Sequence, residues 1–373
     1  MLRTVVGLLV VSVAAVAAGA ELKDAAEALR GKNYPKAVEL LDAYLPDHPK
    51  DPRAYAMRGR ALLELGQFER ALADVNKAIK LRPRENYRDL QNRGRAQFHL
   101  GKVDEALADL TKAIEGAPND ASHRFWRGVI YLNIGKNQQA FDDLHAAVGL
   151  DPNEKCYYML RGETQMRFGL KFETSQRQVG EQTFVVYTVT VADRDCIQSG
   201  IADFERAMAL DANFAEPYLA RARARRALGD YKQAVADEQA YCRLRPDDAH
   251  VLNTTAWQLA VIDDDAVRDG KAALELALKA CELTKHEAVR QLDTLAAAQA
   301  ELGRYRKAVE TQEKALALVR QHPEQGFAPQ QFEERLKLYR ERKPYRTAAN
   351  ELAGPYDGAS LPPPEGPAPT AEM

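Results

Sequence analysis

The sequence has few of the residues that build a catalytic centre or a disulfide-stabilised domain. Only four cysteines and seven histidines occur in 373 residues. No histidines lie at metal-ligand spacing on one helix, and neither a glycine-rich phosphate loop nor a nucleophile elbow occurs. Four cysteines are too few for a disulfide framework in a chain of this length. We therefore expect no enzymatic activity, no cofactor and no bound metal.

An excess of charge of either sign is also missing. The 52 Lys and Arg residues nearly balance the 54 Asp and Glu residues, so the formal net charge is −2. Proteins that bind nucleic acids or membrane surfaces usually carry a basic excess. The composition therefore argues against both functions.

The first twenty residues predict an export signal that is not part of the fold. Arg3 precedes an apolar run at 5–17, and the small residues 18–20 stand just before Glu21. This order is typical of a cleaved secretory signal peptide, here residues 1–20. The apolar run is shorter than the about 20 residues of a membrane span. We expect a periplasmic or secreted protein. The alternative is an uncleaved N-terminal anchor, which would then be its contact with a membrane.

The last twenty residues differ in composition from the rest. From Gly354 to Met373, Pro, Gly and Ala replace any apolar periodicity, so this segment cannot bury enough apolar surface to offset its ordering entropy. We expect residues 354–373 to be disordered and residues 21–353 to fold. That length is large for one globular core and ordinary for an array of repeats.

A repeat of 34 residues organises the folded part. Its positions are read in four segments. From Pro52 they are Tyr55, Gly59, Gly66, Phe68, Ala71, Ala78 and Pro83; from Ala121 they are Arg124, Gly128, Gly135, Asn137, Ala140, Ala147 and Pro152. From Tyr87 they are Gly94, Gly101, Val103, Ala106, Ala113 and Pro118; from Ala215 they are Tyr218, Ala222, Gly229, Tyr231, Ala234, Tyr241 and Pro246. Small residues let two helices approach, Gly ends the first helix and Pro stops the second. Each hairpin must therefore stack on its neighbours.

This pattern resembles the tetratricopeptide repeat family. The resemblance implies an all-α, right-handed superhelical solenoid of about eight helical hairpins that binds another protein. We expect an imperfect first repeat at 24–49, an interrupted fifth at 155–212 and a capping helix at 329–341. Residues 268–346 are also similar to a C-terminal module of exported bacterial, planctomycete-like members of this family.

One arginine and one aspartate recur together along the repeats. They are Arg58 with Asp74, Arg93 with Asp109, Arg127 with Asp143, Arg161 with Asp203, and Arg221 with Asp237. The other repeats lack both residues, which indicates that the two positions touch. We interpret them as structural ion pairs between helices, because a buried charge is costly to leave unpaired. The alternative is a row of arginines that holds an anion.

The resemblance also implies where a partner would bind, because positions 2, 5, 9, 12 and 13 of the first helices line the concave face in this family. The predicted partner-binding residues are Arg60, Arg88, Arg95, His99, Phe125, Val129, Asn133, Met159, Glu163, Arg223 and Arg226. They place basic sectors on both sides of an apolar centre. Such a groove suits an acidic peptide with an apolar anchor. The alternative is a solvated face that binds nothing.

An insertion at 171–196 interrupts the fifth repeat. Residues 183–191 alternate and are rich in Val, Thr, Phe and Tyr, which is typical of a strand. Gly180 and Glu181 can reverse the chain, so we predict a β-hairpin. A two-stranded ribbon is marginal alone. It would pack on the helices, meet a partner or remain disordered.

The cysteines are expected to lie too far apart to form disulfides. Cys156 and Cys196 should stand at opposite ends of the fifth hairpin, roughly 20 Å apart. Cys242 and Cys281 recur in adjacent repeats, roughly 10 Å apart. A disulfide needs Cα atoms within about 7 Å, so we expect four free, mostly packed thiols.

Two functions follow from these observations and remain open. The first is a binding scaffold that holds a protein or peptide in its concave groove. The second is a structural or assembly component of the cell envelope that acts through the β-hairpin.

Overall fold

The computed structural model describes residues 22–348 apart from 83, 85, 180 and 181, and describes residues 172–189 only in their backbone. The predicted signal peptide and C-terminal tail lie outside the described residues. The chain divides into two compact units, here called the N-terminal unit (22–160) and the C-terminal unit (161–348).

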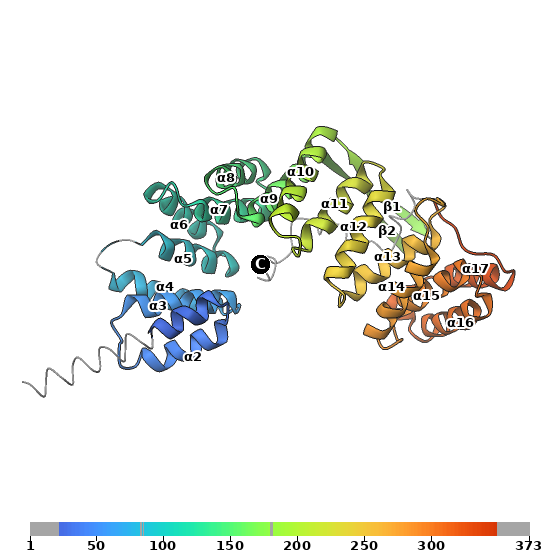
Figure 1. Ribbon diagram of the computed structural model, residues 1–373, viewed down its shortest axis with the longest axis horizontal. Helices are drawn as coiled ribbons and strands as arrows, with labels where there is room; N and C mark the ends of the chain where they lie inside the picture. Colours follow the sequence, from blue (N-terminus) through green and yellow to red (C-terminus); the bar gives the residue numbers. More distant parts are fainter. Residues whose placement is uncertain (1–21, 83, 85, 180–181, 349–373) are drawn as a thin grey trace, which may run out of the picture. The chain divides into compact units, whose positions relative to one another are not determined.

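The N-terminal unit is built from consecutive helices that pair along the chain (Figure 1). A helix at 22–30 precedes α2. The helices are α2 (Tyr34–Tyr44), α3 (Pro52–Glu64), α4 (Phe68–Leu81), α5 (Tyr87–His99), α6 (Val103–Gly116), α7 (Ala121–Asn133), α8 (Asn137–Leu150) and the first part of α9 (Lys155–Gly169). Helix α3 packs on α4, α5 on α6 and α7 on α8.

The C-terminal unit continues the same arrangement. Its helices are α10 (Arg194–Leu210), α11 (Glu216–Ala227), α12 (Tyr231–Leu244), α13 (Ala249–Val261), α14 (Gly270–Leu283), α15 (Val289–Glu301), α16 (Tyr305–Gln321), the 3₁₀ helix η1 (Pro323–Gln325) and α17 (Pro329–Arg340). Helices α11 and α12, α13 and α14, and α15 and α16 form pairs, and α17 packs on α16. The predicted terminal helix is therefore confirmed, ending one residue earlier than expected.

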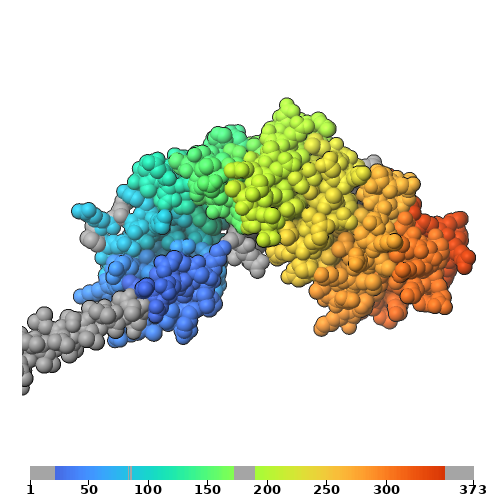
Figure 2. All heavy atoms as spheres, viewed as in Figure 1, coloured from blue at the N-terminus to red at the C-terminus, as the bar shows by residue number. Residues whose placement is uncertain are grey.

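The glycine predicted to end the first helix of a pair adopts a left-handed turn there. Gly66 has φ +70° and Gly229 has φ +85°, a backbone region that residues with a Cβ rarely occupy. Alanines fill the contact between paired helices, and Ala61, Ala71, Ala96 and Ala106 are fully buried. Figure 2 shows side chains filling the spaces between neighbouring helices.

The hairpins also require glycine where two helices cross. A Cβ built on Gly162 would lie 2.7 Å from Phe204 and 3.0 Å from the carbonyl oxygen of Gly200. We expect Gly162→Ala to lower the free energy of unfolding by about 1–3 kcal/mol, because a backbone oxygen cannot move aside. Urea denaturation followed by circular dichroism measures this loss.

The matched control for this substitution is Gly149→Ala in α8. A Cβ there meets nothing within 4 Å, so this change should raise stability by about 0.5–1 kcal/mol through helix propensity. Equal effects of the two substitutions would contradict the close-crossing explanation.

The insertion between α9 and α10 forms the predicted antiparallel pair of strands. Strand β1 (Leu170–Val179) pairs with β2 (Gln182–Val191), in register from Leu170↔Val191 to Val179↔Gln182. The sheet has these two strands, and β2 lies near α11. The expected turn residues 180 and 181 lie outside the described part.

Within the described ranges, none of the helices combines the length and hydrophobicity that crossing a bilayer requires.

Candidate partner-binding faces

All five predicted Arg–Asp pairs are in contact, each between the two helices of one pair. The guanidinium Nε and Nη2 donate to the two carboxylate oxygens at 2.6–2.9 Å. This two-bond geometry is the strong form of an Arg–carboxylate interaction. The five aspartates are at most 8% exposed.

A third guanidinium nitrogen extends the contact to the preceding hairpin. Nη1 of Arg58 donates to Asp42 at 2.6 Å, and Nη1 of Arg127 donates to Thr111 at 3.1 Å. Arg93 and Arg221 make the same kind of contact with Asn76 and Glu205. Each of these arginines therefore joins three helices from two successive hairpins.

Hydrogen bonding to the paired aspartate raises the pKa of Arg58, Arg93 and Arg127. These arginines thus have an internal carboxylate partner, which is the contact predicted from their joint recurrence.

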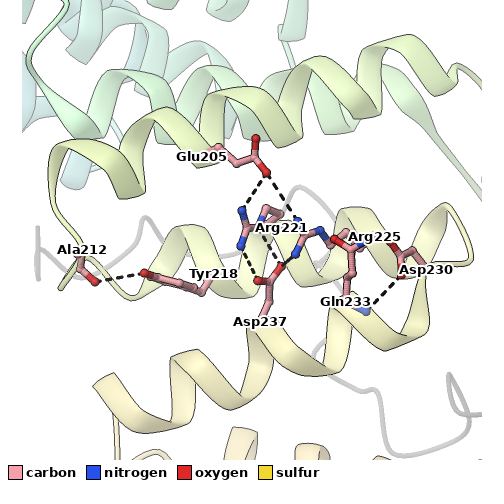
Figure 3. A network of polar contacts seen from close by, with 8 residues as sticks. All are labelled: Glu205, Ala212, Tyr218, Arg221, Arg225, Asp230, Gln233 and Asp237. Carbon is pink, nitrogen blue, oxygen red and sulfur yellow. Dashed lines mark hydrogen bonds and ion pairs between the residues drawn. The ribbon is translucent and has the colours of Figure 1, made fainter. Parts of the chain in front are cut away.

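Figure 3 shows one of these networks, in the C-terminal unit. Asp237 accepts bonds from Arg221 and also from Arg225 at 2.7 Å. Glu205 of α10 accepts a hydrogen bond from Arg221 at 2.9 Å and lies 3.6 Å from Arg225. Two cations and two carboxylates form this network, so its charges balance.

The predicted binding positions of the N-terminal unit divide into exposed and internal residues. Arg60 is exposed on α3. Arg88 has a side chain 79% exposed, 3.6 Å from Asp120. These two cations remain accessible to a partner.

Arg95 corrects the expectation of an open basic sector. Its guanidinium donates to Glu64 at 2.9 Å and lies 4.0 Å above the ring of Trp126, and the residue is only 8% exposed. Glu64 neutralises the charge and Trp126 covers it. The position of Arg95 in the repeat predicted the direction of its side chain. It could not predict that Glu64 and Trp126 of the adjacent hairpins would contact it.

The predicted apolar centre is mostly internal as well. Phe125, Val129 and Met159 are 6–7% exposed, and Phe125 packs on Trp126 and Tyr157. Asn133 donates from its side chain to the carbonyl oxygen of Val129 at 2.8 Å. These residues stabilise the hairpins and offer little area to a ligand.

His99 is half-buried, with its ring stacked on Phe68 at a centroid distance of 4.1 Å. Burial, with a contribution from Arg95, lowers its pKa. His123, which the sequence patterns did not single out, is fully buried and contacts Gln91 at 2.6 Å through Nδ1. Burial lowers the pKa of His123 too.

Stability of the N-terminal unit should therefore fall as the pH drops below about 6.5, the pKa of an unfolded histidine. Below about pH 6.5 the unfolded chain binds protons that the native histidines do not bind. The contribution of these histidines to stability is therefore fully present above about pH 6.5 and is lost as the pH falls to their lower native pKa. Urea midpoints at several pH values measure the slope. His123→Gln should reduce the slope, because it removes a histidine whose native pKa is lowered. An unchanged slope in this variant would contradict this explanation.

The C-terminal unit also separates exposed from internal positions. Arg223 is exposed on α11. Burial raises the pKa of the half-buried Glu163, and the charge of Arg223 opposes this shift without cancelling it. Arg226, by contrast, pairs with the buried Glu238 and donates to Gln258 at 3.1 Å. The prediction of an available cation is therefore wrong for Arg226.

The cysteines match the expectation in part. Cys242 and Cys281 are buried free thiols, and burial raises the pKa of Cys242 to about 11 and that of Cys281 to about 12. Cys156 and Cys196 are half-buried. Cys196 lies in the first turn of α10 and not before it. The described residues contain no group of His, Cys, Asp and Glu side chains suited to a metal ion.

Comparison with known proteins finds a known repeat in part of the N-terminal unit. Models described as tetratricopeptide repeat match residues 52–85 and 92–155, which supports that assignment for the N-terminal unit. No curated protein matches the chain.

Among solved structures, the human IFIT1 dimer with PPP-AAAA is 17% identical with a TM-score of 0.51, covering 78% of this chain and 69% of its own. The Cut9–Hcn1 hetero-tetramer of APC/C is 14% identical with a TM-score of 0.52, covering 74% and 48%. At these identities the likeness concerns the fold alone.

Proposed function

We propose that this chain is a non-catalytic scaffold that binds a protein or peptide on the exposed faces of its first helices. In this proposal about eight tetratricopeptide-type hairpins form a right-handed array, and proteins with this repeat generally mediate protein–protein interactions. The solved Cut9–Hcn1 assembly is consistent with a protein as the class of partner.

The main support for this proposal is that arginines two residues apart on the same helix differ in whether they are paired internally or exposed. Arg58 and Arg221 are held in internal ion pairs, whereas Arg60 and Arg223 are exposed on the same helices. The first set stabilises the hairpins, so the second set is left to attract an acidic partner. The partner would be an acidic protein segment with an apolar anchor.

Affinity capture followed by mass spectrometry would identify a partner, and charge reversal would then test the face. Arg60→Glu and Arg223→Glu should each be measured alone, one in each unit. At least one should weaken binding tenfold or more with unchanged circular dichroism. The control is Arg306→Glu, whose side chain is 87% exposed on α16. If all three variants bind equally, the proposed faces are wrong.

The alternative is assembly through the β-hairpin. Among the described residues its two ten-residue strands pair only with each other, so each has an outer edge that a third strand could join. Replacing residues 171–190 with Asn-Gly would close the hairpin at Leu170 and Val191. Loss of partner capture in this variant, but not in the charge reversals, would favour assembly.

We also propose that the protein is exported by the signal at residues 1–20. N-terminal sequencing of the mature chain should then begin at Glu21. A mature chain that begins at Met1 would contradict cleavage.

A further inference from the structure

A short stretch of the chain beyond α17 lies against the helices of the C-terminal unit. Helix α17 ends at Arg340, and Arg342 has a left-handed backbone with φ +59°. The amide of Lys343 then donates to the carbonyl oxygen of Leu338 at 2.9 Å. Residues 344–347, the sequence Pro-Tyr-Arg-Thr, follow without helical structure and are half-buried.

This stretch, here called the tether, pairs through its backbone with the end of α13. The amide of Thr347 donates to Val261 at 3.0 Å, and the amide of Asp263 donates to Thr347 at 2.9 Å. The two bonds flank Ile262 and form a parallel bridge. Ile262 is extended, with φ −59° and ψ 135°, so the end of α13 offers a strand-like edge. Strand addition of this kind is a general way of binding an extended peptide.

The arginine of the tether meets a prepared acceptor. Arg346 lies 2.5 Å from one oxygen of Glu301, while Arg268 donates to the other oxygen at 2.9 Å. Nη1 of Arg346 also reaches the carbonyl oxygen of Ala260 at 3.5 Å. The Glu301 side chain is only 15% exposed, so its charge is directed at these two guanidinium groups.

The aromatic residue of the tether has its own contacts. The ring of Tyr345 lies 5.9 Å from the ring of Trp257, and the Arg335 guanidinium stands 5.6 Å from the Tyr345 ring. The Tyr345 ring therefore packs between Trp257 of α13 and Arg335 of α17.

We propose that the face formed by α13, α15 and α17 is a binding site for an extended peptide with an aromatic residue followed by arginine, and that the tether occupies it as a built-in ligand. Backbone pairing holds the peptide, Trp257 selects the aromatic ring and Glu301 selects the arginine. This inference rests on the proposed function, because α13 and α15 are the first helices of their pairs. The residues involved differ from Arg60 and Arg223, so the two sets of experiments can fail separately.

A partner segment with this chemistry would displace the tether. Four half-buried residues with two backbone bonds form the kind of element that opens locally before the rest of a structure. Because the tether is covalently linked, its effective concentration is on the order of millimolar. A peptide in solution therefore binds weakly until the tether is released.

The test uses the full chain with Tyr345→Ala and Arg346→Glu, which removes both tether side chains and places a negative charge opposite Glu301. The probe is a fluorescently labelled peptide of residues 341–348, Glu-Arg-Lys-Pro-Tyr-Arg-Thr-Ala. Fluorescence anisotropy should show at least tenfold tighter binding to this variant than to the intact chain. Adding Glu301→Gln should remove most of that gain, and a probe with glutamate at the Arg346 position should not bind.

A released variant that keeps its circular dichroism spectrum and fails to bind the probe would overturn the proposal. Equal binding to the intact chain would overturn it as well, because the site would then not be the occupied one. If the variant does not fold, hydrogen exchange of the intact chain decides. The amides of Thr347 and Asp263 should exchange well before that of Leu259 within α13. Equal protection would mean that the tether is a permanent part of the unit.

Discussion

Arg93→Ala should lower the free energy of unfolding of the N-terminal unit by about 3 kcal/mol. The substitution removes both bonds to Asp109, at 2.6 and 2.7 Å. It leaves a carboxylate that is 8% exposed and that pairs with no other cation among the described residues. An uncompensated buried charge costs more than the net value of the pair that held it. Urea denaturation followed by circular dichroism measures the loss.

Two matched substitutions separate this effect from a general loss of arginine. Arg127→Ala should cost less, because Arg124 remains 3.5 Å from Asp143. Arg53→Ala removes an ion pair whose arginine is 68% exposed and should cost under about 1 kcal/mol. Arg93→Leu combined with Asp109→Leu should recover most of the stability. If Arg93→Ala loses as little stability as Arg53→Ala but loses binding to a partner, the arginines hold an anion and the structural interpretation is wrong.

The parts of this protein that sequence predicted well are those that repeat. The repeat positions of Arg58 and Asp74 hold arginine and aspartate in five hairpins, and the other repeats lack both residues. The structure shows that these two positions are in contact. The turn glycines, such as Gly66, were predictable for the same reason, since glycine adopts that backbone angle at the lowest cost. The strand predicted at 183–191 corresponds to β2 (Gln182–Val191). It was predictable because its apolar residues alternate with a period of two, which differs from the helical period.

The parts that sequence missed depend on contacts between different hairpins. Position 9 predicted that Arg95 faces the groove, but Glu64 and Trp126 come from the hairpins before and after it. A periodic pattern gives the direction of a side chain and not the neighbour it meets. The tether shows the same limit, because Arg346 contacts Ala260 across 86 positions without any local signal.

The largest single effect is expected at Arg335, which sequence patterns also missed. Arg335→Ala should lower the free energy of unfolding of the C-terminal unit by about 3–5 kcal/mol. The side chains of Arg335 and Asp293 are 5% and 3% exposed, and the two pair at 2.8 and 2.9 Å. The guanidinium also lies 5.0 Å from Phe332 and 5.5 Å from Trp257. The substitution therefore removes an ion pair and the cation that three aromatic rings surround.

The pH dependence of this loss identifies its cause. Burial already raises the pKa of Asp293 with Arg335 present, and the pKa should rise further when the cation is gone. A carboxyl with a raised native pKa destabilises the fold increasingly as pH rises above its unfolded value near 3.9, and protonation removes the penalty. The deficit of Arg335→Ala should therefore be largest at pH 7 and shrink toward pH 4.5.

The control is Arg320→Ala, which breaks the exposed pair between Arg320 of α16 and Glu333 of α17. It should cost under about 1 kcal/mol. Arg335→Leu with Asp293→Leu should recover much of the loss, since no charge is left buried. A deficit for Arg335→Ala that does not change with pH would instead attribute the loss to the packing of Trp257, Phe332 and Tyr345 around the arginine.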